Sequence, residues 1–167
     1  WTIGNALGLQ EDLAAYKEVV NTTAMDGGYA VTLHEVVVTE SEVWVNATVR
    51  REDGQPLDIS ASSPIASIKV NGRRVLAGGG GGLKYLDEEQ TIVGIEMCYN
   101  CENVDLVGKT AIDISFRQLD IWENIKGKWD FSFTADASAL MKDTRQIDLN
   151  RTFTLTNGVT VKLAEFP

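Results

Sequence analysis

The amino-acid sequence predicts an all-β protein, specifically an immunoglobulin-like antiparallel β-sandwich with a short N-terminal helix. Three observations lead to this fold class. Apolar and polar residues alternate with period two in roughly eight or nine segments, turn signals recur roughly every ten residues, and helical periodicity is confined to the start of the chain. A closed β-barrel is the main alternative. The chain lacks the cysteine pair and intervening tryptophan of antibody domains, so the likeness is one of architecture.

Composition limits the number of domains and the class of partner. The 167 residues, 44% hydrophobic and 23% charged, suffice for one domain with its own core. We expect one sandwich with its helix over residues 1–150, and either its closing strands or the truncated start of a second β module over residues 151–167. The net charge of -9 and the scattered 15 Lys and Arg argue against binding to nucleic acid or to an anionic membrane surface.

Membrane and secretion signals are missing from the sequence as it stands. No apolar run approaches the roughly 18 residues of a membrane-spanning helix, and no secretory signal is present. Because the chain begins at Trp1 rather than Met, we expect it to be a piece of a longer protein.

The first element expected is a short amphipathic helix. Leu9, Leu13, Tyr16 and Val20 recur at helical spacing, and we expect the helix to pack against one end or edge of the sheet. The following residues 21–28, with their Asp-Gly-Gly ending, are expected to form a loop.

Two strands joined by the turn Thr39–Glu42 follow, over residues 28–51. The first strand changes parity, since Val31 and Leu33 share one face while Val36 and Val38 continue on the other. One extra residue in a strand has this effect, so we expect a β-bulge near His34 and Glu35. The second strand alternates regularly, with Val43, Val45, Ala47 and Val49 on one side.

The middle of the chain predicts a hairpin, a loop and a further strand. Residues 65–70 are a strand, and Asn71-Gly72 is typical of a type I′ turn, in which both central residues need positive φ. The glycine run 78–82 is expected to be a mobile loop, because glycine loses the most backbone entropy on ordering, and residues 83–90 are expected to be mostly exposed. Residues 91–99 return to a strand, whose partner is expected to begin near Lys109.

Residues 110–122 form the longest predicted strand, with a second bulge near Gln118 where the parity changes again. After a turn at residues 124–128, the most regular core strand places four apolar side chains on one face. These are Trp129, Phe131, Phe133 and Ala135. Trp44, Trp122 and Trp129 are expected to pack in the core or along strands rather than stack on a ligand.

The end of the chain resembles the first strand of the opening hairpin. Residues 28–36 align without gaps with residues 158–166 and share the pattern G-x-x-V-x-L-x-E followed by an apolar residue. The match has two explanations. Residues 151–167 begin a second module of the same kind, which we favour slightly, or two strands that each follow a tight turn are alike by chance.

Four segments of the sequence together resemble the DUF4179 family. They are a helix before a G-Y-x-V-T-L-x-E-V-V-V strand, the V-W-V-x-A-T-V strand after it, G-K-W-D-F-S-F at residues 127–133, and T-L-T-N-G-V-T-V-K-L near the end. The resemblance covers nearly the whole chain. It implies the extracytoplasmic region of an anti-sigma-factor-like membrane protein of Gram-positive bacteria, anchored in the cell membrane by one helix that this sequence lacks.

The resemblance brings no catalytic residue and no cofactor to this chain. It implies an unknown extracellular ligand or protein as the partner, and contact with a sigma factor only through a cytoplasmic part that is absent here. We therefore expect a non-catalytic sensory or protein-interaction domain. The alternative is a cell-surface adhesive or carbohydrate-binding β-sandwich, which would need aromatic residues on an exposed sheet face. An enzyme would need clustered carboxylates in a deep cleft.

Cys98 and Cys101 form the one short motif with its own chemistry. A structural zinc site needs four ligands, more than the two Cys and one His of this chain provide. A redox pair needs a helix N-terminus and positive neighbours, whereas the acidic Glu96 and Glu102 flank this CxxC. Residues so placed across a turn lie within about 7 Å of each other, close to the span of a disulfide. We expect a local disulfide between Cys98 and Cys101 in an oxidising compartment, with free thiols as the alternative.

Three other features have ordinary structural interpretations. The glycine run lacks the Lys-Ser/Thr of a phosphate-binding loop. His34 has no nucleophile motif to support a catalytic triad and is expected at the surface or at the rim of the sheet. The acidic residues 87–89 lack the alternating ligand spacing of calcium loops and are expected to be a solvated turn. The sequence therefore predicts no metal site and no cofactor.

Overall fold

The computed structural model describes residues 17–39, 41–59, 65–75, 80–104, 106, 108–120, 124–136, 151–154 and 159–163. All regular elements among them are β-strands. The strands are β1 (Lys17–Asp26), β2 (Tyr29–Val38), β3 (Glu42–Arg51), β4 (Ile65–Val70), β5 (Arg73–Arg74), β6 (Gly81–Tyr85), β7 (Ile92–Asn100), β8 (Lys109–Asp120), β9 (Ile125–Asp136), β10 (Arg151–Thr154) and β11 (Thr160–Leu163).

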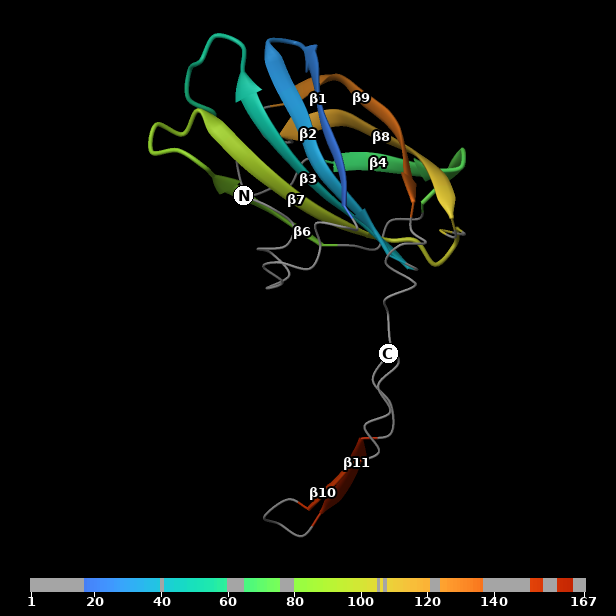
Figure 1. The fold of residues 1–167 in the computed structure, drawn as a ribbon. Coiled ribbons are helices and arrows are strands. Elements are labelled where there is room, and N and C mark those ends of the chain that lie inside the picture. The colour runs from blue at the N-terminus through green and yellow to red at the C-terminus, as the bar shows by residue number, and fades with distance from the viewer. Residues whose placement is uncertain are drawn as a thin grey trace.

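Two antiparallel sheets pack face to face (Figure 1). The larger has the strand order β1-β2-β3-β7-β6, and the smaller has the order β5-β4-β8-β9. The all-β prediction is therefore confirmed, in a sandwich-like arrangement. The strands β10 and β11 pair only with each other among the described strands. Whether they close the first sandwich or begin a second module stays a prediction.

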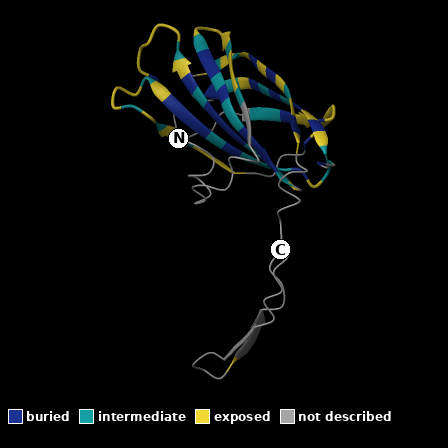
Figure 2. Ribbon diagram, in the orientation of Figure 1, coloured by how far each residue is buried: buried dark blue, intermediate teal, exposed yellow. Residues whose placement is uncertain are grey.

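The core lies between the two sheets, as the buried inner surfaces in Figure 2 show. The large sheet contributes the alternating apolar side chains of β2, β3 and β7, mostly valines, and the small sheet contributes mainly the isoleucines and aromatics of β4, β8 and β9. Phe116 and Phe131 meet edge to face, with ring centroids 6.2 Å apart. Burial of each such aliphatic or aromatic side chain contributes about 1.5–3 kcal/mol, so the period-two pattern is the main source of stability.

The hairpin β2–β3 has the predicted bulge. Leu33 pairs with Ala47 and Glu35 pairs with Asn46, so His34 is the extra residue in β2. The second predicted bulge is also confirmed, because the register of β8 against β9 shifts on either side of Gln118.

The remaining turn and core-strand predictions agree with the structure as well. Asn71 and Gly72 have φ values of 49° and 76°, as the type I′ turn between β4 and β5 requires. In β9, Trp129, Phe131 and Ala135 are buried, and Phe133 packs partly buried against the core.

The N-terminal prediction is wrong where the structure describes it. Residues 17–20, given to the helix, and residues 21–26, given to a loop, form strand β1, paired antiparallel with β2. The β-branched residues at positions 19, 20, 22 and 23 favour this strand, and Val20 fell on the helical spacing by coincidence. The rest of the predicted helix, with Leu9, Leu13 and Tyr16, lies outside the described residues.

The glycine run also needs correction. Gly81 and Gly82 are not in a mobile loop but begin the edge strand β6. A Cβ atom at Gly81 would lie 2.6 Å from the backbone oxygen of Glu96, so glycine permits the close approach of β6 to β7. Residues 78 and 79 lie outside the described part. The strand continues through Tyr85, and residues 83–90 are mostly exposed, as predicted, with Leu83, Tyr85 and Asp87 half-buried.

The pairing of β7 was predicted wrongly. Its neighbours are β3 and β6, not the strand that begins at Lys109. That strand, β8, lies in the other sheet between β4 and β9. Alternation identifies a strand but carries no information on which of several similar strands it joins. The predicted turn at residues 124–128 is shorter than expected, since β9 begins at Ile125.

The first turn of the large sheet touches the small sheet directly. The carboxylate of Asp26 accepts a hydrogen bond from the Lys128 backbone N–H at 2.6 Å, and the Trp129 Nε1–H donates to the Tyr29 carbonyl at 3.0 Å. Gly27, with φ of 58°, lies against Lys126, whose backbone oxygen would be 3.3 Å from an added Cβ. These contacts join β1 and β2 to β9 on one side of the molecule.

Candidate functional site

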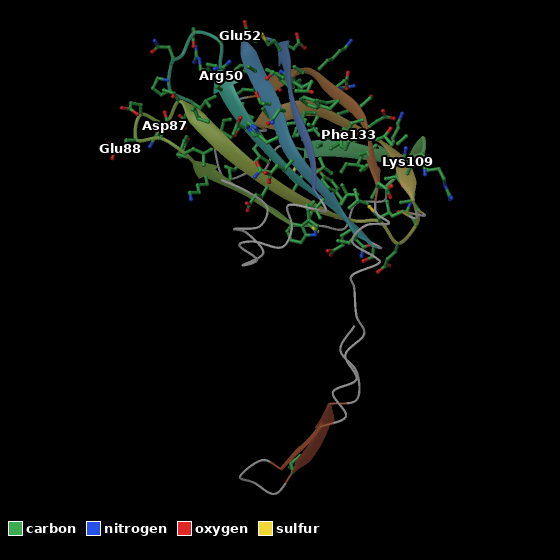
Figure 3. The ribbon with its side chains drawn as sticks, viewed as in Figure 1. Arg50, Glu52, Asp87, Glu88, Lys109 and Phe133 are labelled. Atoms are coloured by element: carbon green, nitrogen blue, oxygen red, sulfur yellow. The ribbon has the colours of Figure 1, made fainter. Side chains whose placement is uncertain are left out.

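A groove lies on the outer face of the large sheet, lined by residues of four of its strands and of the turns beside them. Met25, Ala30, Arg50 and Ile92 stand in one row across β1, β2, β3 and β7, because each is the register partner of the next. The groove has a volume of about 400 Å³ and is also lined by Arg51, Glu52, Gly54 and Thr91. Figure 3 shows Arg50 and Glu52 at this end of the sheet.

Among the described residues that line it, the groove combines exposed apolar side chains with one available positive charge. Met25 is 62% exposed and Ile92 is 36% exposed. Arg50 is exposed, and its side chain forms no ion pair or hydrogen bond with any other described residue. A guanidinium between apolar side chains is suited to an anionic group attached to an apolar body.

The neighbouring arginine, Arg51, forms an ion pair with Asp53. Arg51 donates from Nε to Asp53 Oδ1 at 2.9 Å and from a terminal nitrogen to Asp53 Oδ2 at 2.5 Å. This two-pronged hydrogen bond lowers the pKa of Asp53, helped by the Gln55 backbone N–H. Arg50 is therefore the cation of the groove that a ligand can engage without breaking an existing pair.

A turn built on Asp87 holds one wall of the groove. The Asp87 carboxylate accepts hydrogen bonds from the Thr91 backbone N–H at 3.0 Å, from the Thr91 hydroxyl, and from the Ile92 backbone N–H at 2.9 Å. These bonds lower the pKa of Asp87, the Thr91 hydroxyl contributing most. The acidic stretch 87–89 was expected to be a solvated turn, and Asp87 in fact fixes Thr91 and Ile92 in place.

Replacing Asp87 by alanine is expected to lower the melting temperature, because the Thr91 and Ile92 donors lose their acceptor. Since the pKa of Asp87 is lowered in the fold, its contribution to stability is present above the ordinary aspartate pKa of 3.8 and is lost as the pH falls through the lowered pKa. Thermal unfolding of the wild type and of Asp87→Ala measures the difference in melting temperature. The matched control is Glu88→Ala on the same turn, and equal melting temperatures for the two variants would contradict the assignment.

His34 lies on the same outer face, at the bulge between β1 and β3. Its Nδ1 is 3.3 Å from Asn21 Oδ1, and its Nε2 is 2.8 Å from Thr48 Oγ. A neutral ring with its proton on Nδ1 satisfies both contacts by donating to Asn21 and accepting from Thr48. Burial lowers the pKa of His34, although the charge of Glu35 acts in the opposite direction. His34 is thus half-buried on the outer face and links three strands.

Stability is expected to fall as the pH drops from neutrality to about pH 5. The pKa of His34 in the fold is below the ordinary histidine pKa of 6.5, so the unfolded chain binds the proton more readily over that range and the folded state loses stability. Burial raises the pKa of Glu96, which works in the opposite direction. Denaturant unfolding at both pH values checks the claim, and His34→Gln isolates this contribution because His34 is the one histidine of the chain. An unchanged pH dependence in His34→Gln would contradict it.

Cys98 and Cys101 are free thiols in the structure. Cys98 lies in β7 opposite Trp44, while Cys101 is fully buried just beyond the strand. Burial raises the pKa of each thiol to about 11, and Glu42 adds to the effect. Both groups are therefore weak nucleophiles at neutral pH. The disulfide between them stays a prediction for an oxidising compartment.

The remaining sequence candidates do not come together in one place. His34, the CxxC pair and the Asp87 turn occupy separate parts of the large sheet, and no three metal-ligating side chains are grouped in the described part of the chain. The groove itself was missed. The alternation of β3 already places Arg50 on the outer face, away from the core valines of that strand. The alignment of Arg50 with Met25 and Ile92, however, follows only from the pairing register of the strands.

Comparison with known proteins finds a similar fold among solved structures. No protein-family model matches the chain, and no curated protein matches it. A solved structure, the conserved domain protein from Bacillus anthracis, has a similar fold. The TM-score is 0.57 and the sequence identity is 17%, over 76% of this chain and 44% of that chain. The likeness supports the fold, and this chain spans less than half the length of that protein. Within the described residues, the structure has no helix long and apolar enough to cross a membrane.

Proposed function

We propose that this chain is a non-catalytic, extracytoplasmic sensory or protein-interaction domain of a single-pass membrane protein. In this proposal the sandwich is of the immunoglobulin-like type, and the full-length protein is an anti-sigma-factor-like regulator of the DUF4179 kind. A cytoplasmic part absent from this chain would contact the sigma factor. The domain described here would receive the external signal.

The observation that carries the proposal is the placement of the family-like motifs in the fold. The G-Y-x-V-T-L-x-E-V-V-V and V-W-V-x-A-T-V segments are strands β2 and β3, near the middle of the large sheet, and include the bulge at His34. The G-K-W-D-F-S-F segment is the part of β9 that touches the β1–β2 turn through Trp129. These three segments lie in the two packed sheets, which supports a likeness based on a common domain, whereas the fourth segment extends into β10 and β11, which pair only with each other among the described strands.

The open groove beside Arg50 supports a binding role, because it leaves apolar and charged groups available to a partner. For the carbohydrate-binding alternative, an exposed aromatic on a sheet face would be the favouring observation. Trp44 is on the outer face of β3, but it is half-buried and its Nε1–H donates to Glu42 at 3.0 Å. No described tryptophan or tyrosine is exposed.

The complete reading frame tests the proposal. We expect a segment of about 20 apolar residues upstream of Trp1, preceded by a short cytoplasmic part. A gene in which Trp1 follows a cleaved secretory signal, or in which no apolar segment lies upstream, would contradict the single-pass arrangement. Co-purification of the full-length protein with a sigma factor, lost when the cytoplasmic part is deleted, would test the regulatory role separately.

A further inference from the structure

Exposed apolar side chains are concentrated around the groove. Four large hydrophobic residues are exposed among the described ones, namely Met25, Leu86, Ile92 and Val159. Met25 and Ile92 line the groove, and Leu86 is tied to Ile92 by a backbone hydrogen bond of 2.9 Å. Three of the four thus lie at one end of the large sheet. Such clustering of exposed apolar side chains indicates a binding site.

The charges of the groove select the kind of ligand. Arg50 is an available guanidinium in a protein of net charge -9, and its planar fork matches a carboxylate with two parallel hydrogen bonds. Arg51 is held by Asp53, and Glu52 adds a negative charge to the lining. The single positive charge of Arg50 is suited to a singly charged anion. The negative charge of Glu52 beside it disfavours a doubly charged group such as a phosphate.

We propose that this groove binds the C-terminal end of a short apolar peptide. The terminal carboxylate pairs with Arg50, and the last apolar side chains lie against Met25 and Ile92. The volume of about 400 Å³ is near the lower end of the range for small-ligand sites, which limits the occupant to the final few residues. This inference deepens the proposed function, because it names a ligand class for the sensory domain.

Methyl NMR spectra of the whole 167-residue chain, labelled at methionine and isoleucine, test the inference. The probe is N-acetyl-Ala-Leu-Phe with a free carboxylate, and the comparison probe is the same peptide with a C-terminal amide. We expect the Met25 and Ile92 methyl signals to shift with the carboxylate peptide. Affinity for the amide is expected to be weaker by about tenfold or more, because the charged hydrogen bonds to Arg50 are lost.

Two variants show whether Arg50 is responsible. Arg50→Gln is expected to weaken binding of the carboxylate peptide by about tenfold or more and to bind both peptides equally. Arg73→Gln, which removes an exposed arginine from β5 in the other sheet, is expected to bind like the wild type. Both variants should melt near the wild-type temperature, since neither side chain is buried.

Three results would overturn the inference. They are shifts of Met25 and Ile92 that are equal for the acid and the amide, undiminished binding by Arg50→Gln, and no shift of these methyl groups with either peptide. None of these results bears on whether an apolar segment lies upstream of Trp1, so a failure of this inference is distinguishable from a failure of the proposed function.

Discussion

Replacing Trp129 by alanine is expected to lower the free energy of unfolding by about 3–5 kcal/mol. The side chain is fully buried and is the largest in the core. Its Nε1–H also donates to the Tyr29 carbonyl at 3.0 Å, so the variant leaves both a cavity and an unpaired acceptor. Urea unfolding followed by circular dichroism measures the change.

Two further variants separate packing from hydrogen bonding. Trp129→Phe keeps much of the ring but removes the donor to Tyr29, and we expect an intermediate loss. Trp44→Ala is the matched control, because that indole is half-buried on the outer face and donates to Glu42 of its own strand. An equal loss of stability in Trp44→Ala and Trp129→Ala would contradict the claim that Trp129 joins the two sheets.

Replacing Gly127 by alanine is expected to cost about 1–3 kcal/mol by overpacking. A Cβ atom at this position would lie 2.5 Å from Cη2 and 2.8 Å from Cζ2 of Trp129. The indole cannot move aside readily, because it is fully buried and its nitrogen is held by Tyr29. Chemical denaturation of the purified variant measures the loss.

Gly82→Ala provides the control for this second prediction. Gly82 is also a glycine within a strand, and nothing lies within 4 Å of a Cβ atom built there. The substitution should therefore be neutral or slightly stabilising, through the reduced entropy of the unfolded chain. Equal losses in Gly127→Ala and Gly82→Ala would show that contact with Trp129 is not the cause.

The elements that the sequence predicts correctly are those whose signals lie in residues close together in the chain. The strands β2, β3, β7 and β9 follow from alternation, and the parity change near His34 placed a bulge correctly. Asn71-Gly72 determined its own turn, since few other residues adopt positive φ at both positions. Each of these features depends on residues close together in the sequence.

Features that depend on distant neighbours could not be predicted in this way. Gly81 belongs to a strand because β6 pairs with β7, and its lack of a side chain permits the close approach of the Glu96 backbone oxygen. Strand β1 exists because β2 offers it a pairing edge. The groove requires β1, β2, β3 and β7 in one register, which brings Met25, Arg50 and Ile92 into line. Pairing of strands is decided by the packing of the whole sheet.

The location of the domain is the central claim, and labelling of intact cells tests it most directly. Arg73 is exposed on β5, so a cysteine there is accessible, whereas Cys98 and Cys101 have pKa values raised to about 11 and should react slowly. The full-length protein carrying Arg73→Cys is treated with a membrane-impermeant maleimide in intact protoplasts, beside the unsubstituted protein. We expect labelling of Arg73→Cys alone, before lysis. Labelling of that variant only after lysis would contradict an extracytoplasmic domain.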